Sequence, residues 1–190
     1  MKALGLILAA GNSSRFGNSK NKLRENFRGK PLISYVLEAA KNADFEDVAV
    51  VVGKDQMLDL IPQDFTILEN SSSELGLASS LRVGVDYAFR FGYESVIVAL
   101  GDMPFISSLA FEKIRVAEDA SIAVCTYNGV RGHPVKLGKD VWFLLPISGD
   151  VGAKSLFDYD GRNIVEIECD GNCIDIDTEE DLKEWNLKTK

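Results

Sequence analysis

The chain has 190 residues, of which 46% are hydrophobic and 26% are charged, and its formal net charge at pH 7 is −8. This size and composition are ordinary for a globular protein, so we expect residues 1–190 to form one domain. A protein this acidic lacks the basic surface that releases counterions from a nucleic acid, which argues against nucleic acid as a partner. The longest apolar run, 3–10, is too short to cross a bilayer or to act as a strong signal peptide, so we expect no membrane association and a cytoplasmic location.

The cysteines and the histidine argue against a Cys/His metal site. Cys125, Cys169 and Cys173 are odd in number and lack zinc-cluster spacing, and His133 is the only histidine of the chain. We expect the three cysteines to be buried free thiols.

Segments typical of strands alternate with segments typical of helices. Continuous apolar runs such as 3–8 are characteristic of parallel strands that are buried on both faces. Strand–helix alternation predicts the α/β class, as a single three-layer α/β/α domain with a mostly parallel central sheet. In chain order we expect a strand at 3–8, a helix at 31–40, strands at 48–52 and 65–68, a helix at 77–91, a strand at 95–100, a helix at 109–116, strands at 122–126, 130–137 and 173–176, and a last helix with Thr178 as its N-cap.

The loop that follows the first expected strand has the composition of a phosphate-binding loop. It runs from Ala9 to Gly17 and is rich in small residues, which let the backbone approach a ligand closely. Arg15 adds a bidentate phosphate donor, and Lys22 adds a compact positive charge. Five residues separate Gly11 from Gly17, so the loop is not a Walker motif, and a G-x-G-x-x-G dinucleotide motif is absent. The alternative interpretation is a flexible surface loop with solvated basic residues.

Carboxylates lie at the ends of two other expected strands. Asp102 follows the strand at 95–100, and Asp175 and Asp177 belong to the last strand end, where alternation places both on the same side. Ligands of doubly wound sheets bind beyond the carboxyl ends of the strands, and Mg²⁺ binds carboxylates beside a triphosphate. The alternatives are that Asp102 initiates a turn and that Asp177 helps Thr178 to cap the last helix.

Together, the basic loop and the acidic strand ends predict a site for a nucleotide with Mg²⁺ as cofactor. No Ser-His-Asp or Cys-His pair can be assembled around a protein nucleophile. Positioning and charge neutralisation are what phosphoryl-type transfer requires, so we expect chemistry of that kind.

Motifs along nearly the whole chain resemble those of nucleotidyltransferases with a Rossmann-like pyrophosphorylase fold. The segment 8–17 (LAAGNSSRFG) resembles the family signature L-A-A-G-x-S-x-R-x-G, and 76–84 (GLASSLRVG) is similar to its G-x-x-x-S-L-x-x-G segment. Further blocks are Lys22-Leu23, GKPLI at 29–33, GDMP at 101–104, RGHPV at 131–135, GDVGAK at 149–154 and DIDTEEDL at 175–182. The last three resemble most closely the branch that contains molybdenum cofactor cytidylyltransferase.

This resemblance implies roles for individual residues. Arg15, Lys22 and Asp102 would be catalytic, because the two cations would stabilise the departing pyrophosphate. Asp102 and Asp177 would hold Mg²⁺, with Asp175 as the substitute for Asp177. The implied nucleotide-binding residues are Leu8, Ala9, Ala10, Gly11, Asn12, Ser13, Ser14, Arg15, Lys22, Ser79, Ser80, Gly101 and Asp102, with Ser80 preferred to Ser79 as the nucleoside contact.

The resemblance also implies the two substrates. A terminal phosphate of a molybdopterin-type acceptor would attack the α-phosphorus of CTP and release pyrophosphate, and an ionised phosphate needs no general base. Ala10 stands where the guanylyl branch has Gly, which goes with CTP over GTP. A molybdoenzyme that receives the cofactor is the implied protein partner. The residues implied for the acceptor are Arg131, His133, Asp150 and Lys154.

Departures from the family pattern leave alternatives open. The stretch 18–21 is slightly longer than usual, so Lys20 is an alternative to Lys22, and Lys154 stands where Arg is common. Three other functions also remain as alternatives. The first is a CTP- or GTP-dependent transferase for another phosphorylated acceptor such as a sugar or polyol phosphate, and the second is a non-catalytic carrier of molybdenum cofactor. The third is an NAD-dependent reductase, against which the missing dinucleotide motif argues.

Overall fold

A computed structural model describes residues 2–11, 16, 21–54, 57–117, 120–157 and 164–188. Its strands are β1 (Ala3–Ala9), β2 (Asn26–Phe27), β3 (Lys30–Pro31), β4 (Asp47–Val52), β5 (Thr66–Glu69), β6 (Ser95–Leu100), β7 (Ile122–Tyr127), β8 (Val130–Gly138) and β9 (Ile164–Glu168). Its α-helices are α1 (Ile33–Lys41), α2 (Leu77–Arg90), α3 (Ser108–Arg115) and α4 (Glu179–Leu187). Its 3-10 helices are η1 (Lys22–Arg24), η2 (Leu58–Leu60), η3 (Ser73–Leu75), η4 (Lys139–Leu144) and η5 (Gly152–Leu156). In these ranges, no helix combines the length and apolar character that crossing a membrane requires.

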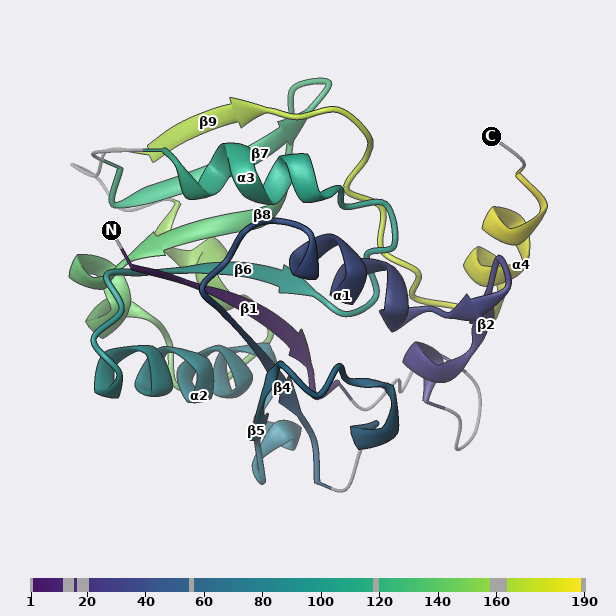
Figure 1. The fold of residues 1–190 in the computed structure, drawn as a ribbon, viewed down its shortest axis with the longest axis horizontal. Helices are drawn as coiled ribbons and strands as arrows, with labels where there is room; N and C mark the ends of the chain where they lie inside the picture. The colour runs from purple at the N-terminus through teal and green to yellow at the C-terminus, as the bar shows by residue number, and fades with distance from the viewer. Residues whose placement is uncertain are drawn as a thin grey trace.

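The centre of the molecule is a seven-stranded sheet with the strand order β5-β4-β1-β6-β8-β7-β9 in the described part of the chain (Figure 1). β8 runs antiparallel to both of its neighbours, and the remaining pairs are parallel. The mostly parallel sheet predicted from the sequence is therefore confirmed. β1 lies between β4 and β6, so the carboxyl ends of these three strands share one edge of the sheet.

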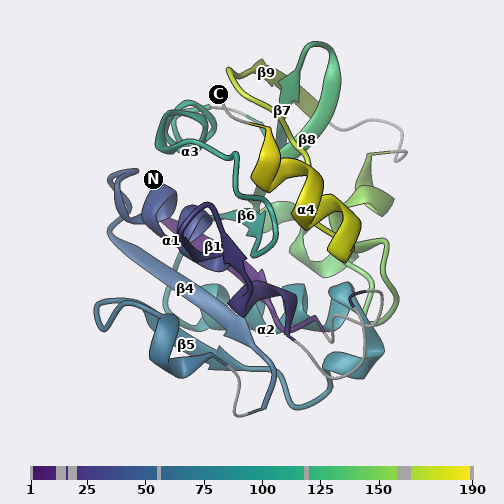
Figure 2. The ribbon, with the colours of Figure 1, turned by 90° about the vertical axis from the view of Figure 1, so that its right-hand side faces the viewer.

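Helices cover both faces of this sheet (Figures 1 and 2). α1 and α3 pack on one face around Ile7, and α2 packs on the opposite face around Leu6 and Leu8. Because successive residues of a strand point to opposite faces, the apolar run of β1 contributes to both hydrophobic clusters. The structure has the three-layer α/β/α architecture that the alternation of elements predicts.

The last segment before α4 differs from the prediction. Residues 173–176 form no strand, and the Ile176 amide donates a hydrogen bond to the Asp102 carbonyl oxygen at 3.0 Å. The edge of β7 is instead occupied by β9, a strand that we did not predict. The alternation of apolar and polar residues at 173–176 suits any extended backbone with one buried face, and Ile176 is fully buried here.

A hairpin formed by β2 and β3, also not predicted, holds α4 in place. The Arg28 guanidinium donates hydrogen bonds to the carbonyl oxygens of Trp185 at 3.0 Å and of Lys188 at 2.6 Å, which close the carboxyl end of α4. At the other end, Thr178 is the N-cap of α4, as predicted, and it forms a capping box with Asp181. Figure 2 shows α4 in front of the carboxyl edge of the sheet, so the chain just before it passes over the ends of the central strands.

A glycine sets the distance between α2 and β1. Gly84 is buried in the middle of α2, and a Cβ atom added to it would lie 2.4 Å from Cδ2 and 2.5 Å from Cδ1 of Leu6. Real Cβ atoms do not approach other atoms this closely. α2 can therefore lie at its present distance from β1 only because residue 84 has no side chain.

We expect Gly84→Ala to destabilise the protein. The substitution favours the helix by about 1 kcal/mol but overpacks a tight contact, which costs about 1–3 kcal/mol. Urea unfolding should therefore show that the free energy of unfolding falls, by up to about 2 kcal/mol. In a Leu6→Val background, which lacks both Cδ atoms, the loss should be smaller. An equal effect of Gly84→Ala in both backgrounds would contradict the proposed contact.

Candidate functional site

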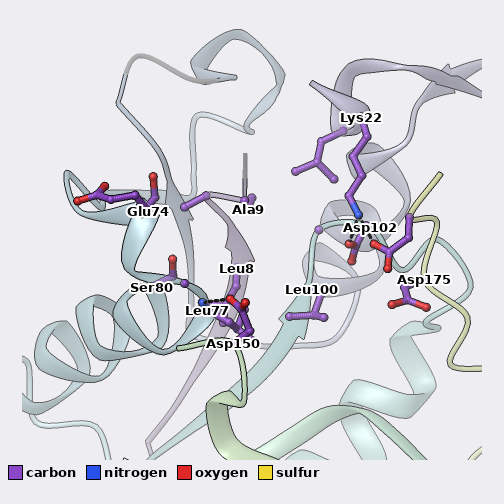
Figure 3. Close-up of a pocket in the computed structure, with 17 residues that line it drawn as sticks. Leu8, Ala9, Lys22, Glu74, Leu77, Ser80, Leu100, Asp102, Asp150 and Asp175 are labelled. Atoms are coloured by element: carbon purple, nitrogen blue, oxygen red, sulfur yellow. Dashed lines mark hydrogen bonds and ion pairs between the residues drawn. The ribbon is translucent and has the colours of Figure 1, made fainter. Parts of the chain in front are cut away.

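A cavity of about 420 Å³ opens where the carboxyl ends of β1 and β6 meet the start of α2. This is the edge at which ligands bind in doubly wound sheets. Two groups of residues face it (Figure 3). The group from η3, α2 and the loop before η5, which we call the helix end, comprises Glu74, Gly76, Leu77, Ser80 and Asp150. The other group, the acidic end, comprises Lys22, Asp102, Asp175 and Asp177, and between the two lie Leu8, Ala9, Ala10, Gly11, Leu100 and Gly101.

Lys22 joins two carboxylates at the acidic end. Its Nζ lies 2.7 Å from Oδ2 of Asp102 and 2.6 Å from Oδ1 of Asp177. The side chains of Lys22 and Asp102 are only 13% and 16% exposed, so water screens this ion pair weakly. Burial alone would lower the pKa of Lys22, but the carboxylates of Asp102 and Asp177 outweigh it and raise that pKa above its usual value. Lys22 therefore carries a full positive charge between two acidic groups.

The acidic end also contains carboxylate oxygens suited to a cation. Oδ1 of Asp102 is buried and has no hydrogen-bond partner among the described residues. Burial raises the pKa of Asp175, and the neighbouring carboxylates of Asp177 and Asp102 raise it further. Within the described ranges, no group of three or more His, Cys, Asp or Glu residues is arranged to hold a metal ion. One or two carboxylates, completed by phosphate oxygens and water, are the ligand set that Mg²⁺ usually takes, so this site fits an ion that is shared with a phosphorylated ligand.

At the helix end, two adjacent serines differ in their surroundings. The side-chain amide of Asn70 donates a hydrogen bond to Oγ of Ser79 at 2.9 Å and to Oγ of Ser80 at 3.0 Å. The Ser79 hydroxyl lies 2.8 Å from the Gly76 carbonyl oxygen, to which it donates, and it does not line the cavity. Ser80 does line it. The geometry therefore favours Ser80 for ligand contact and gives Ser79 a local role at the start of α2.

Gly76 lets the loop before η5 approach the start of α2. Its φ is +90°, and an added Cβ would lie 2.6 Å from Oδ1 of Asp150 and 2.8 Å from the backbone of Gly149. The Ala78 amide donates to the Gly149 carbonyl oxygen at 2.9 Å, and the Gly149 amide donates to the Leu75 carbonyl oxygen at 2.7 Å. Two sequence motifs separated by about seventy residues thus form one wall of the cavity, and this places Asp150 in it.

Three of the four residues implied for an acceptor do not line this cavity. Arg131 forms an ion pair with Glu166, with Nε 2.7 Å from Oε1, and Lys154 is exposed on η5. Burial lowers the pKa of His133 to about 4, although Asp175 opposes this shift, so His133 is neutral at pH 7. Its backbone carbonyl accepts a hydrogen bond from the Tyr127 hydroxyl at 2.7 Å. Only Asp150 of this group lies in the cavity.

Other predicted residues fall outside the described ranges, and some lining residues were not predicted. Residues 12–15, which include Asn12, Ser13, Ser14 and Arg15, and Lys20 lie outside the described residues. Among the described residues, sequence reasoning missed Leu23, Ser73, Glu74, Gly76, Leu77 and Leu100 as lining residues. Gly76 and Leu77 belong to the recognised motif at 76–84, and Ser73 and Glu74 lie within three residues of its start, so the motif itself was the signal for this wall.

The sequence is similar to that of known proteins over most of its length. Residues 5–166 match the model of the MobA-like NTP transferase domain. The bifunctional protein GlmU of Agrobacterium fabrum is 32% identical over 136 residues, which cover 66% of this chain and 29% of that protein. The chain thus spans less than a third of the length of this relative.

Solved structures share the fold over the whole chain. The crystal structure of Rv0371c from Mycobacterium tuberculosis H37Rv matches with a TM-score of 0.83 at 24% identity and covers 100% of both chains. A nucleotidyl transferase from Methanothermobacter matches with a TM-score of 0.80 at 21% identity and covers 96% of this chain and 95% of that chain. The chain belongs to the family of MobA-like NTP transferase domains, which confirms the nucleotidyltransferase resemblance of its motifs.

Proposed function

We propose that the protein transfers CMP from CTP to the terminal phosphate of a molybdopterin-type acceptor in a Mg²⁺-dependent reaction that releases pyrophosphate. The observation that carries this proposal is the position of Lys22 between Asp102 and Asp177, in a cavity whose other wall is the start of α2. A nucleotidyltransferase needs positive charge for a triphosphate, oxygen ligands for a divalent ion and a separate surface for the nucleoside. Lys22, the carboxylates of the acidic end and the start of α2 support these three roles.

The transfer follows from the positions of these groups. Backbone groups of Ala9 to Gly11 would approach the nucleotide where β1 ends, and Ser80 would contact the nucleoside from α2. An oxygen of the acceptor phosphate bonds to the α-phosphorus as the bond from that phosphorus to the bridging oxygen breaks, and the electron pair leaves with pyrophosphate. Lys22 would stabilise the negative charge that develops on this leaving group, and the family resemblance implies Arg15 as a second cation. The acceptor is already ionised, so the reaction needs no protein base.

The net charge of the chain makes local neutralisation essential. The protein carries a formal charge of −8, and a triphosphate brings several more negative charges into a cavity lined by carboxylates. Asp102 and Asp177 would hold a divalent ion, and its positive charge would reduce this repulsion. A structure of Rv0371c has been solved in complex with manganese (TM-score 0.79, 24% identity), and the same class of ion is proposed here.

Two classes of acceptor are candidates for this reaction. The motifs at 131–135, 149–154 and 175–182 support a molybdopterin-type acceptor, with a molybdoenzyme as the recipient of the product. The inositol-1-phosphate CTP transferase from T. maritima has a similar fold (TM-score 0.75, 16% identity), which makes a polyol phosphate the second candidate acceptor.

Product analysis separates these candidates. Purified protein would be incubated with CTP or GTP, Mg²⁺ and each of several acceptors: molybdopterin, molybdenum cofactor, inositol 1-phosphate and a sugar 1-phosphate. Mass spectrometry should detect the CMP adduct of a molybdopterin-type acceptor. An adduct formed only with a polyol or sugar phosphate would show that this phosphate, and not molybdopterin, is the acceptor. Release of no pyrophosphate with any pair would favour a non-catalytic carrier of molybdenum cofactor.

The three carboxylates of the acidic end should differ in their effect on catalysis. Asp102→Asn and Asp177→Asn keep the side-chain size and remove a charged ligand, so each should reduce kcat/KM by about 10²-fold or more. Asp175→Asn should have a milder effect because it leaves the contacts of Lys22 with Asp102 at 2.7 Å and with Asp177 at 2.6 Å in place. Thermal melts would verify that each variant folds. Activity of Asp102→Asn within about tenfold of wild type, a change of only about 1.4 kcal/mol, would refute its role.

The nucleotide preference should depend on Ala10. This residue lines the cavity, yet its side chain is only 2% exposed because it packs in the hydrophobic cluster under α2. Its methyl group therefore sets how closely the backbone at the end of β1 can approach α2, and thus the space left for a base. Because a purine is larger than a pyrimidine, we expect CTP to be preferred over GTP. Ala10→Gly should narrow this preference, as measured by kcat/KM for both nucleotides with one acceptor. Preference for GTP in the wild type would contradict the proposal, whereas an unchanged CTP preference in the variant would exclude Ala10 as its cause.

A further inference from the structure

Lys22 occupies the position between the two carboxylates that we propose as ligands of the divalent ion. Figure 3 shows its ammonium group directed at Asp102, with dashed contacts to the acidic side chains. The ammonium group lies 2.7 Å from Asp102 and 2.6 Å from Asp177, which is the range of strong charge-assisted hydrogen bonds. Both carboxylates are thus already bound to a positive charge that is part of the chain.

An ammonium group and a divalent ion cannot share these oxygens without a large repulsion. Mg²⁺ contacts its oxygen ligands at about 2.1 Å, which would place it within a few ångströms of the Lys22 nitrogen. Like charges at such a distance repel strongly in a site that water screens weakly. A metal ion that takes the oxygens contacted by Lys22, Oδ2 of Asp102 and Oδ1 of Asp177, must therefore displace the ammonium group.

The local structure allows the side chain to move while the backbone stays in place. Lys22 begins η1, where the side chain of Asn21 accepts a hydrogen bond from the Leu23 amide at 3.1 Å, and Leu23 is buried. The backbone is anchored on both sides of Lys22, and only its flexible four-carbon stem has to reorient. Within the same cavity, the oxygens of a bound triphosphate would offer the ammonium group a new set of anionic partners.

We propose that Lys22 is a placeholder for the divalent ion: it holds Asp102 and Asp177 together and excludes a free metal ion until a nucleoside triphosphate draws the ammonium group away. This inference rests on the proposed function, and it adds an order of events. The metal ion enters with the nucleotide and not before it. The two carboxylates keep a positive partner throughout, first Lys22 and then the metal ion, while Lys22 changes its partners from carboxylates to phosphates.

The proposal is tested by metal binding in the absence of nucleotide. Lys22→Met removes the charge and keeps most of the side-chain volume, so this variant should bind Mn²⁺ alone more tightly than wild type by about tenfold or more, as measured by electron paramagnetic resonance. Lys30→Met is the matched control, because Lys30 forms an ion pair with Glu38 outside the cavity and its loss also removes one positive charge. The control should bind Mn²⁺ like wild type. Adding Asp102→Asn to Lys22→Met should abolish the gain.

The outcomes separate this inference from the proposed function. Mn²⁺ binding by Lys22→Met no tighter than by wild type would overturn the placeholder role, even if the wild type proved to be an active transferase. Tighter binding without turnover by the wild type on any acceptor would support the placeholder and reject the function. Thermal melts of Lys22→Met and Lys22→Gln provide a second readout: Mn²⁺ should stabilise both variants more than wild type. Variants that stay unfolded with and without Mn²⁺ would contradict the proposal, because the ion should replace the lost ammonium group.

Discussion

The ion pairs of Lys22 with Asp102 and Asp177 are the contact on which the rest of the site depends. They connect three segments that are distant in sequence: the chain after the first loop, the end of β6 and the segment before α4. Two carboxylates that both contact one ammonium group are close enough to repel each other, and each loses solvation on burial. The lysine offsets both costs, and it does so at the edge of the sheet where a ligand has access.

The surrounding fold holds these three segments in the positions that bring their side chains together. β6 places Asp102 beside the end of β1, because the two strands are parallel and paired along their length. The position of Asp177 depends on α4, which is fixed by its capping box and by Arg28 of the β2–β3 hairpin. Lys22 precedes that same hairpin, so one small substructure carries a residue to the acidic end and supports another. The cost of assembling the site is thus met by packing and hydrogen bonds outside the cavity.

Much of this arrangement could be predicted from the sequence, and the failures have physical reasons. β1 and β6 were predictable because buried parallel strands require continuous apolar runs, and Asp102 followed from the end of one of them. The segment 173–176 was misassigned because alternation identifies an extended backbone but not its hydrogen-bond partners, which depend on the strand that fills the neighbouring edge. The contact of Lys22 with both carboxylates was not predicted, since it arises only when three separate segments meet in space.

The helix end shows the same limit on a smaller scale. Ser79 and Ser80 are neighbours in one motif, and the preference for Ser80 as the nucleoside contact came from the family resemblance alone. Only the packing of α2 reveals that Ser79 bonds to the carbonyl oxygen of Gly76 while Ser80 faces the cavity. The motif therefore locates the region, and the side-chain environment shows which of its two serines faces the cavity.

A crystal structure with CTP and Mn²⁺, in which anomalous scattering locates the ion, would test the proposed roles of Lys22, Asp102 and Asp177 together. We predict an anomalous peak about 2.1 Å from carboxylate oxygens of Asp102 and Asp177, with the triphosphate in the same cavity and the Lys22 ammonium group on the triphosphate oxygens. A nucleotide bound elsewhere, or an ion bound away from these two carboxylates, would contradict these roles.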